Sequence, residues 1–309
     1  MILPVADGEY YSMLISSLIA AGSANLHRES IDWHNRVITN GGRVSVSTLK
    51  AVSNFCYKID AAGIRDKFVR LNLFCGNNLS SAVVPLYKSK SFGGTVYGGN
   101  LDENNNFIST DYAETGANGG IKGGGGAGKW LDPALTIGIC AQAGLDWSTN
   151  HIGFYITNDA NIVTDYWIGG DDCVYACSYG NSLFWYNDAG GYYAGGHGCG
   201  DHAILTNSSN HNGFMLGTYS TISTGDVYRN GVSISNGVQT FGGTFPTDDA
   251  TPLIVVGTVY SQEDCSFFYQ DTGATSGGYS IGLGLSASEC LSYNSIMQAF
   301  QTSLGRERL

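Results

Sequence analysis

The stretch "RLNLFCG", residues 70–76, marks the point where the sequence changes from a helical to a strand pattern. Leu71, Leu73 and Cys75 stand at every second position, as on one face of a β-strand. Short runs of this kind recur as far as about residue 285, separated by turn residues such as Asn230-Gly231. Many short strands with no helical pattern between them predict an antiparallel sandwich or barrel.

The residues before this stretch are predicted to be helical. One helix over Ile31–Ile38 should end at Asn40-Gly41-Gly42, and a second should be capped by Ser47 and end at Ala62-Gly63. We therefore predict a helical N-terminal anchoring segment over residues 1–68 and a sandwich over residues 69–309.

The last part of the chain predicts one further helix, over residues 286–304. Ser286 and Glu289 form the S-x-x-E pattern of a capping box, and Gly305 follows the last turn. The expected apolar stripe consists of Leu291, Tyr293, Ile296, Met297, Phe300 and Leu304.

The charge of the chain limits its partners. The 309 residues carry a formal net charge of −11, and ten of the fifteen Lys and Arg lie in residues 1–90. The acidic remainder repels phosphate backbones, so we expect no nucleic-acid partner. The apolar run over residues 13–21 is too short to cross a bilayer, and no basic residue precedes it. We expect no signal peptide, no transmembrane segment and no membrane insertion.

The stretch "KGGGGAGKW", residues 122–130, contains the G-x-x-x-x-G-K spacing of a phosphate-binding loop. Trp130 stands where such a loop has Ser or Thr, residues 113–121 are no buried strand, and residues 135–140 predict a strand where a helix should follow. We therefore interpret the stretch as the lead-in to a strand that begins near Lys129, with the lysine in solvent.

Eight cysteines are spread along the chain, and we expect most of them to be reduced and buried. One group of Cys and His within 30 residues could hold zinc, although its spacing matches no standard finger. A disulfide between its first two members, or unlinked loop and core residues, are the alternatives. We expect no cofactor, with zinc or calcium as the exceptions to test. The metal candidates are Cys173, Cys177, His197, Cys199 and His202.

No catalytic pattern is visible in the sequence. The chain has only seven Glu, none in the E-x-D-x-x-E pattern of sandwich glycosidases. A G-x-S-x-G spacing occurs at residues 278–282, but it lies within the strand pattern of residues 279–285 and not at a strand-to-helix turn, so it is no nucleophile elbow. We therefore predict that the protein is not an enzyme. A glycan-cleaving activity would require the fold to bring two carboxylates to within about 5–10 Å of each other in a groove.

Residues 165–193 are rich in aromatic side chains interleaved with Asp and Asn. Aromatic rings stack on the apolar face of a sugar, and carboxylates or amides bind its hydroxyls. The alternative is that about half of these rings belong to the core. The ligand-binding candidates are Trp167, Asp171, Asp172, Trp185, Tyr186, Asn187 and Asp188.

Three stretches together resemble phage tail-associated and other virion proteins with a concanavalin A-like (laminin-G-like) sandwich domain. They are "TLKAVSNFCYKIDAAGIRDKFVRLNLFCGNNLSSAVVPLY" (48–87), "VYRNGV" (227–232) and "LGLSASECLSYNSIMQAFQTSLGR" (283–306). The resemblance implies a jelly-roll sandwich and supplies no catalytic residue. Laminin-G relatives bind Ca²⁺ and glycans, but their ligand positions have no match here.

From this resemblance we expect a non-enzymatic phage virion structural protein, located in the tail, a fibre or the capsid surface and made in the host cytoplasm. Residues 1–68 would contact other virion proteins, and the chain would form a homo-oligomer. The alternative is a glycan-binding receptor-recognition protein that binds a host-surface glycan, and a glycan-cleaving enzyme is the third reading.

Overall fold

A computed structural model gives the structure of the protein. It describes residues 25–88, 99–124, 128–146, 148–158, 165–171, 181–188, 191–198, 212–221, 224–234, 247, 252–261, 267–271 and 273–308. Only the backbone is described for residues 165–171, 181–188, 191–198, 257–261 and 267–271.

The first helix, α2 (Arg28–Thr39), agrees with the prediction at its C-terminal end. Asn40 occupies the C-cap, and Gly41 follows with a φ of +74°, a left-handed conformation that glycine adopts without strain. At the other end His27 is the N-cap, and its side chain accepts a hydrogen bond from the backbone N–H of Glu29. An imidazole nitrogen here replaces the usual hydroxyl or carboxylate cap.

The second helix, α3 (Val46–Ala61), begins two residues earlier than Ser47 would allow. Ser45 is the N-cap, and its hydroxyl accepts from the backbone N–H of Thr48 at 3.0 Å. The prediction of Ser47 as cap is therefore wrong. Both serines carry a suitable hydroxyl, but Ser45 has the extended backbone that an N-cap requires.

The C-terminal helix, α6 (Ala287–Ser303), has the predicted capping box between Ser286 and Glu289. Gly305 ends it with a φ of +67°. One member of the expected apolar stripe is wrong, because Leu291 is 53% exposed while the neighbouring Cys290 is fully buried. The other five members of the predicted stripe are buried, and Cys290 takes the place of Leu291.

The strands form two sheets of eight strands each within the described residues. The first has the order β12-β11-β10-β6-β16-β4-β3, with β1 also paired to β16. Its strands are β1 (Phe68–Asn72), β3 (Tyr112–Ala113), β4 (Gly120–Lys122), β6 (Asn150–Asn158), β10 (Gly213–Thr221), β11 (Thr224–Arg229), β12 (Val232–Ser233) and β16 (Thr275–Gly282).

The second sheet has the order β15-β14-β7-β13-β5-β2, with β8 paired to β7 and β9. Its strands are β2 (Glu103–Asn105), β5 (Trp130–Thr136), β7 (Asp165–Asp171), β8 (Asn181–Asp188), β9 (Gly191–Gly198), β13 (Pro252–Val255), β14 (Gly257–Ser261) and β15 (Phe267–Asp271). Its strand pairs are antiparallel except for β7 with β14. Two further short helices, α4 (Leu79–Ala82) and α5 (Ile137–Gln142), lie in connections.

These pairings confirm a mainly antiparallel β protein with helices at both ends of its sequence. The predicted hairpin is present, since Asn230 and Gly231 both have positive φ between β11 and β12. The strand expected over residues 135–140 is wrong in its second half. Thr136 ends β5 and caps α5 by accepting from the N–H of Ile139 at 3.1 Å. The concanavalin A-like subclass of the sandwich stays a prediction.

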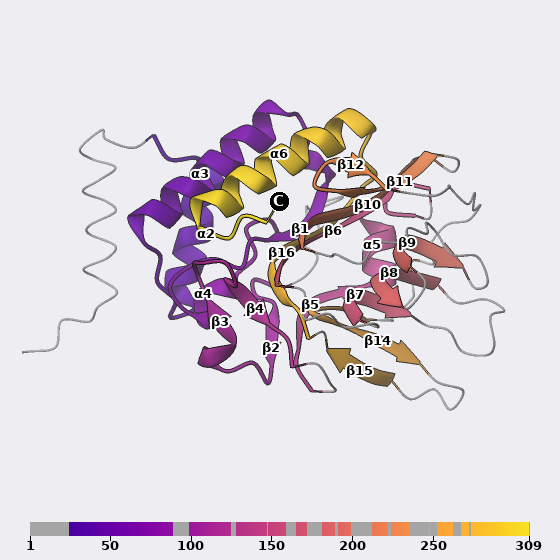
Figure 1. The fold of residues 1–309 in the computed structure, drawn as a ribbon, viewed down its shortest axis with the longest axis horizontal. Coiled ribbons are helices and arrows are strands. Elements are labelled where there is room, and N and C mark those ends of the chain that lie inside the picture. The colour runs from indigo at the N-terminus through magenta and orange to yellow at the C-terminus, as the bar shows by residue number, and fades with distance from the viewer. Residues whose placement is uncertain are drawn as a thin grey trace, which may run out of the picture.

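The helices α2, α3 and α6 lie on one side of the first sheet, and the second sheet lies on its other side (Figure 1). Strand β6 shows how this arrangement buries both faces of a strand. Ile152, Phe154 and Ile156 belong to the core between the sheets, whereas Tyr155 belongs to the core under the helices. A strand in this position has no solvent-exposed face, and all five residues of β1 are likewise buried.

The C-terminal residues after α6 are anchored by Arg306, whose side chain is fully buried. Its guanidinium donates to backbone carbonyls of Glu114 at 2.6 Å and Phe74 at 2.8 Å. Arg308 extends the contact by donating to the carbonyl of Thr157 at 2.6 Å. The end of the described chain thereby joins the first sheet to the segments that precede β4.

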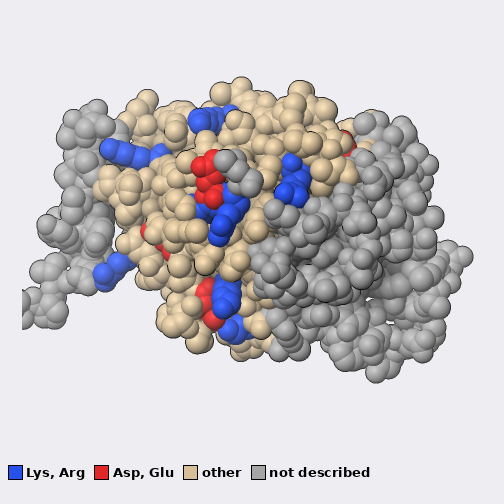
Figure 2. All heavy atoms as spheres, in the orientation of Figure 1, with Lys and Arg blue, Asp and Glu red and all other residues tan. Residues whose placement is uncertain are grey.

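The glycine-rich stretch leads into β5, which begins at Trp130 as predicted. The lysine before it is not free in solvent, contrary to the prediction. Lys129 Nζ lies 2.9 Å from both carboxylate oxygens of Asp111, and its side chain is 28% exposed. In the middle and near the lower edge of the face in Figure 2, Lys or Arg likewise stands beside Asp or Glu, whereas other Lys and Arg on this face stand apart. Of the described helices, none has the length and apolar character to cross a membrane.

Candidate functional site

The predicted ligand-binding residues lie mostly on two neighbouring strands of the second sheet. Trp167 and Asp171 are in β7, and β8 contains the candidates from Trp185 to Asp188. The strands are antiparallel, with Tyr166 opposite Tyr186. The backbone therefore brings the two halves of the aromatic segment side by side, while Asp172 lies outside the described residues.

Most of the predicted metal-binding residues lie outside the described part of the chain, so the prediction is not tested. His197 is in β9, whereas Cys173, Cys177, Cys199 and His202 lie outside the described residues. The cysteine prediction is confirmed where the side chains are described. The four buried, free thiols are those of Cys56, Cys75, Cys140 and Cys290.

The structure contains a pocket that the sequence did not indicate, and we call it the β2–β5 pocket. Its volume is about 520 Å³, which is within the usual range of small-ligand sites. It lies where α4 and the segment before β2 meet β5 (Figure 1). Its lining consists of Asn40, Leu79, Ser80, Val83, Gly99, Asn100, Leu101, Asp102, Glu103, Asn104, Asp132 and Ala134.

Two carboxylates face each other across the paired strands in this pocket. Glu103 of β2 is directly opposite Asp132 of β5 in the antiparallel register, so both side chains leave the sheet on the same face. Directly opposed residues have Cβ atoms about 4.5–5.5 Å apart. Like charges in such a pair oppose folding, and a function that needs both carboxylates is one reason for a protein to keep them.

The surroundings of Asp132 raise the pKa of its carboxyl. Burial raises the pKa of the Asp132 carboxyl, and the nearby carboxylates of Glu103 and Asp102 raise it further. The backbone N–H of Ala134, which donates to Asp132 Oδ1 at 2.7 Å, acts in the opposite direction. Ala134 itself has a φ of +55°, a strained conformation for a residue with a side chain.

The floor of the pocket is held by a fully buried ion pair between Arg70 and Asp102. Arg70 Nη2 lies 2.6 Å from Asp102 Oδ1, and both side chains are 0% exposed. The same carboxylate accepts from Asn72 Nδ2 at 2.7 Å and from the Tyr279 hydroxyl at 2.9 Å. Every oxygen of the buried carboxylate is therefore satisfied, as a buried charge requires.

Arg70 also shapes the wall of the pocket. Its guanidinium donates to the carbonyl of Gly99 at 2.7 Å and to that of Leu101 at 2.9 Å. On the opposite wall Asn40 Nδ2 donates to the carbonyl of Ser80 at 2.8 Å. The pocket is thus preformed by polar contacts with the backbone, which hold its lining in place without a ligand.

Comparison with known proteins gives no family for the chain. No protein-family model and no curated protein matches it. Membership of the virion family therefore stays a prediction from the sequence.

Several solved structures match at low similarity. A mutant of Trypanosoma rangeli sialidase displaying trans-sialidase activity is 13% identical, with a TM-score of 0.45 over 81% of this chain and 39% of that one. Trypanosoma rangeli sialidase in complex with sialic acid is 11% identical, with a TM-score of 0.41 over 80% of this chain and 38% of that one. The CBM40 module of Ruminococcus gnavus IT-sialidase, bound to α2,3-sialyllactose, is 12% identical, with a TM-score of 0.35 over 56% of this chain and 92% of that module.

These comparisons correct one prediction from the sequence. The prediction that the protein is not an enzyme is contradicted by the two sialidase structures above, which match over 81% and 80% of this chain. The chain spans 39% of the length of the first of them, and a likeness of this degree shows neither an activity nor a ligand.

Proposed function

We propose that the protein binds carbohydrate in the β2–β5 pocket. The observation that carries the proposal is the pocket itself, which combines carboxylates and amides with an apolar surface from Leu79, Val83 and Leu101. Carboxylates and amides bind sugar hydroxyls, and the apolar residues cover the less polar face of the ring. The carboxylate of Glu103 accepts no hydrogen bond from the described residues, so it is available to a ligand.

The charge of the pocket selects the kind of sugar. Three carboxylic residues, Asp102, Glu103 and Asp132, line the pocket, and none of its described lining residues is Lys or Arg. Arg70 lies behind the lining and its charge cancels that of Asp102, so Glu103 and Asp132 are the carboxyl groups that a ligand would meet. An anionic sugar would meet repulsion here, whereas a neutral sugar or an amino sugar would not. We therefore propose neutral glycans or glycans containing an amino sugar as ligands.

A glycan array probed with the full-length chain tests this proposal. We expect saturable binding to neutral or amino-sugar glycans, and loss of that binding in Ser80→Trp, which places an indole at the exposed rim of the pocket. Ser288→Trp on the exposed surface of α6 is the matched control and should bind as the wild type does. Binding restricted to sialylated glycans would refute the charge argument. Binding that survives Ser80→Trp would place the site elsewhere, with the strands β7 and β8 as the next candidates.

The carboxylate pair favours a second function, hydrolysis of a glycosidic bond in the same pocket. Retaining glycosidases place two carboxyl groups about 5–5.5 Å apart, one protonated and one ionised. The register of β2 and β5 places the Cβ atoms of Glu103 and Asp132 about 4.5–5.5 Å apart, which allows such a separation of their carboxyl groups, and the raised pKa of Asp132 suits it to the role of proton donor. Glu103 would then be the nucleophile or base.

Activity assays separate hydrolysis from binding alone. Neutral and amino-sugar aryl glycosides should be cleaved by the wild type, and Asp132→Asn or Glu103→Gln should lower kcat by at least about 100-fold. Both variants keep the volume of the side chain they replace, so glycan binding should persist in them. A wild-type chain that binds these sugars and cleaves none of them would leave the binding function and remove the hydrolytic one.

A further inference from the structure

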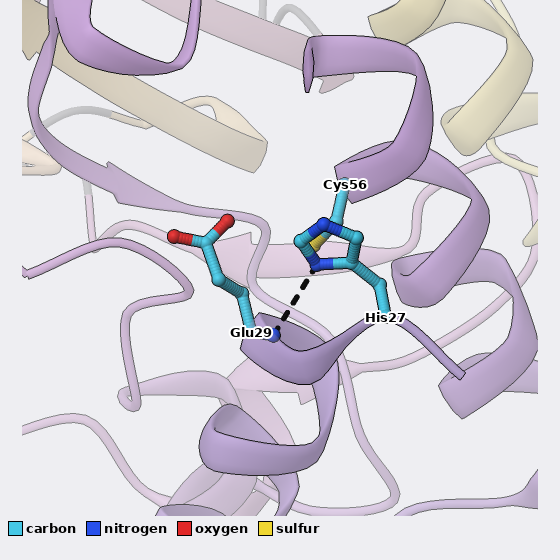
Figure 3. A group of neighbouring side chains, drawn as sticks. All are labelled: His27, Glu29 and Cys56. Carbon is cyan, nitrogen blue, oxygen red and sulfur yellow. Dashed lines mark hydrogen bonds between the residues drawn. The ribbon is translucent and has the colours of Figure 1, made fainter. Parts of the chain in front are cut away.

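His27, Glu29 and Cys56 bring three different metal-binding groups together between the first two described helices. His27 and Glu29 stand at the start of α2, and Cys56 projects from α3. One ligand atom from each of the three lies within 4.8 Å of the other two. Figure 3 shows the imidazole in front of the Cys56 sulfur, with the Glu29 carboxylate to one side. No other group of His, Cys, Asp and Glu in the described part of the chain is gathered in this way.

A second carboxylate orients the histidine. His27 Nε2 lies 2.9 Å from Asp60 Oδ2, a contact in which the ring N–H donates to the carboxylate. Metal-binding histidines usually donate their other ring N–H to a carboxylate in this manner. The acceptor nitrogen is then Nδ1, which faces only the backbone N–H of Glu29, at the long distance of 3.2 Å. Without a metal, the lone pair of Nδ1 accepts only this long hydrogen bond, which caps α2.

Glu29 also has an unused ligand atom. Its Oε1 accepts from Arg65 Nε at 2.6 Å, but its Oε2 is buried and has no hydrogen-bond partner among the described residues. A buried carboxylate oxygen without a partner is costly, and most such atoms in proteins are satisfied. A cation at this position would satisfy it.

The charges around the three groups match a divalent cation. Binding of a metal ion displaces the proton of the Cys56 thiol, and the thiolate, Glu29 and Asp60 then carry three negative charges. Arg65 supplies one positive charge, and its guanidinium carbon lies 3.7 Å from the centre of the Tyr87 ring, so it is held beside the cluster. Two negative charges remain, which one divalent ion would neutralise.

We infer that His27, Glu29 and Cys56 bind one zinc ion that joins the start of α2 to α3. Nitrogen, oxygen and sulfur ligands together suit zinc, whereas calcium and magnesium take oxygen ligands. A tetrahedral zinc site has ligand atoms about 3.3–3.8 Å apart, so ligand atoms up to 4.8 Å apart need to close by at most about 1.5 Å. His27 and Glu29 are partly exposed, and solvent takes the fourth position.

Titration of the full-length, reduced chain with Co²⁺ as a spectroscopic substitute for zinc tests the inference. After removal of metal with a chelator, we expect one equivalent of Co²⁺ to give a thiolate-to-metal charge-transfer band, which Zn²⁺ then removes. Cys56→Ser should abolish the band. Asp60→Asn, which removes the partner of His27, should weaken the affinity by about 10–100-fold.

Two controls make the result specific to this cluster. Cys140→Ser changes another fully buried thiol, in α5, and should leave the band unchanged. If the band survives Cys56→Ser but disappears in Cys177→Ser, the metal lies in the other Cys and His group and the inference is overturned. If circular dichroism shows that Cys56→Ser is unfolded, Glu29→Gln at a partly exposed position decides in its place. An unchanged Co²⁺ affinity in Glu29→Gln would equally overturn the inference.

Discussion

Replacing Asp102 by Asn should destabilise the protein strongly. Among the described ion pairs, we expect no other Asp→Asn or Glu→Gln change to lower the free energy of unfolding as much. Burial alone would lower the pKa of Arg70, and the adjacent Asp102 carboxylate raises it, so the guanidinium is charged in the folded protein. Asp102→Asn leaves that charge buried at 0% exposure without a counter-ion. Breaking one side of a buried pair costs about 3–5 kcal/mol, a large part of a total stability of about 5–15 kcal/mol.

The measurement is urea unfolding of the full-length chain, followed by circular dichroism and tryptophan fluorescence. Asp111→Asn is the matched control, because Asp111 pairs with Lys129 in a partly exposed contact, Asn keeps an oxygen that can accept from the N–H of Ile108, and loss of the charge should cost about 1 kcal/mol. The double variant Arg70→Met with Asp102→Asn should show a coupling of at least about 2 kcal/mol between the two sites. A cost for Asp102→Asn equal to that of Asp111→Asn, with no coupling, would refute the argument.

Three further predictions follow from single side chains. Burial lowers the pKa of His151 to about 4. Its contribution to stability is therefore complete above the ordinary pKa of 6.5 and is lost as the pH falls from 6.5 through 4. Between pH 7 and pH 5 the free energy of unfolding of the wild type, measured in urea, should fall by about 2 kcal/mol more than that of His151→Gln. Ser286→Ala removes the N-cap of α6 and should cost about 1 kcal/mol in thermal unfolding, with an unchanged Tm contradicting a role for the cap. Phe300→Ala removes the ring that meets Phe55 edge to face at 5.7 Å and should cost about 3–5 kcal/mol, whereas Leu291→Ala on the exposed side of α6 should cost less than about 1 kcal/mol.

The elements with local signals could be predicted from the sequence. The capping box at Ser286 and the stop at Asn40-Gly41 depend on side chains and backbone angles within one turn of the helix end. The choice of Ser45 over Ser47 and the burial of Cys290 instead of Leu291 depend on how each helix packs against its neighbours in the fold. A pattern of spacings contains no information about that contact.

The strand that opens the sandwich shows a different limit. In "RLNLFCG" the period of two assigns Arg70 and Asn72 to a polar face, but both are buried in the interior of the protein. They are there because Asp102, thirty-two positions away from Arg70, supplies a carboxylate in a connection that has no pattern of its own. Tyr279 completes the group from β16.

The candidate sites could not be predicted from the sequence for the same reason. Glu103 and Asp132 become a pair only through the register of β2 against β5, and His27 meets Cys56 only through the packing of α2 on α3. Residues separated by tens of positions can be matched only when the fold is known.

The position of β16 in the sequence determines when this protein can fold during its synthesis. This strand pairs with β1, β4 and β6, and Arg306 after it fixes the segments near residues 74 and 114. While the ribosome is still making the middle of the chain, β1 and β6 lack their common neighbour, and their apolar faces stay open to water. The sheet can close only after residues 275–306 have left the ribosome. Newly made chains should therefore need protection by chaperones until translation has passed this point.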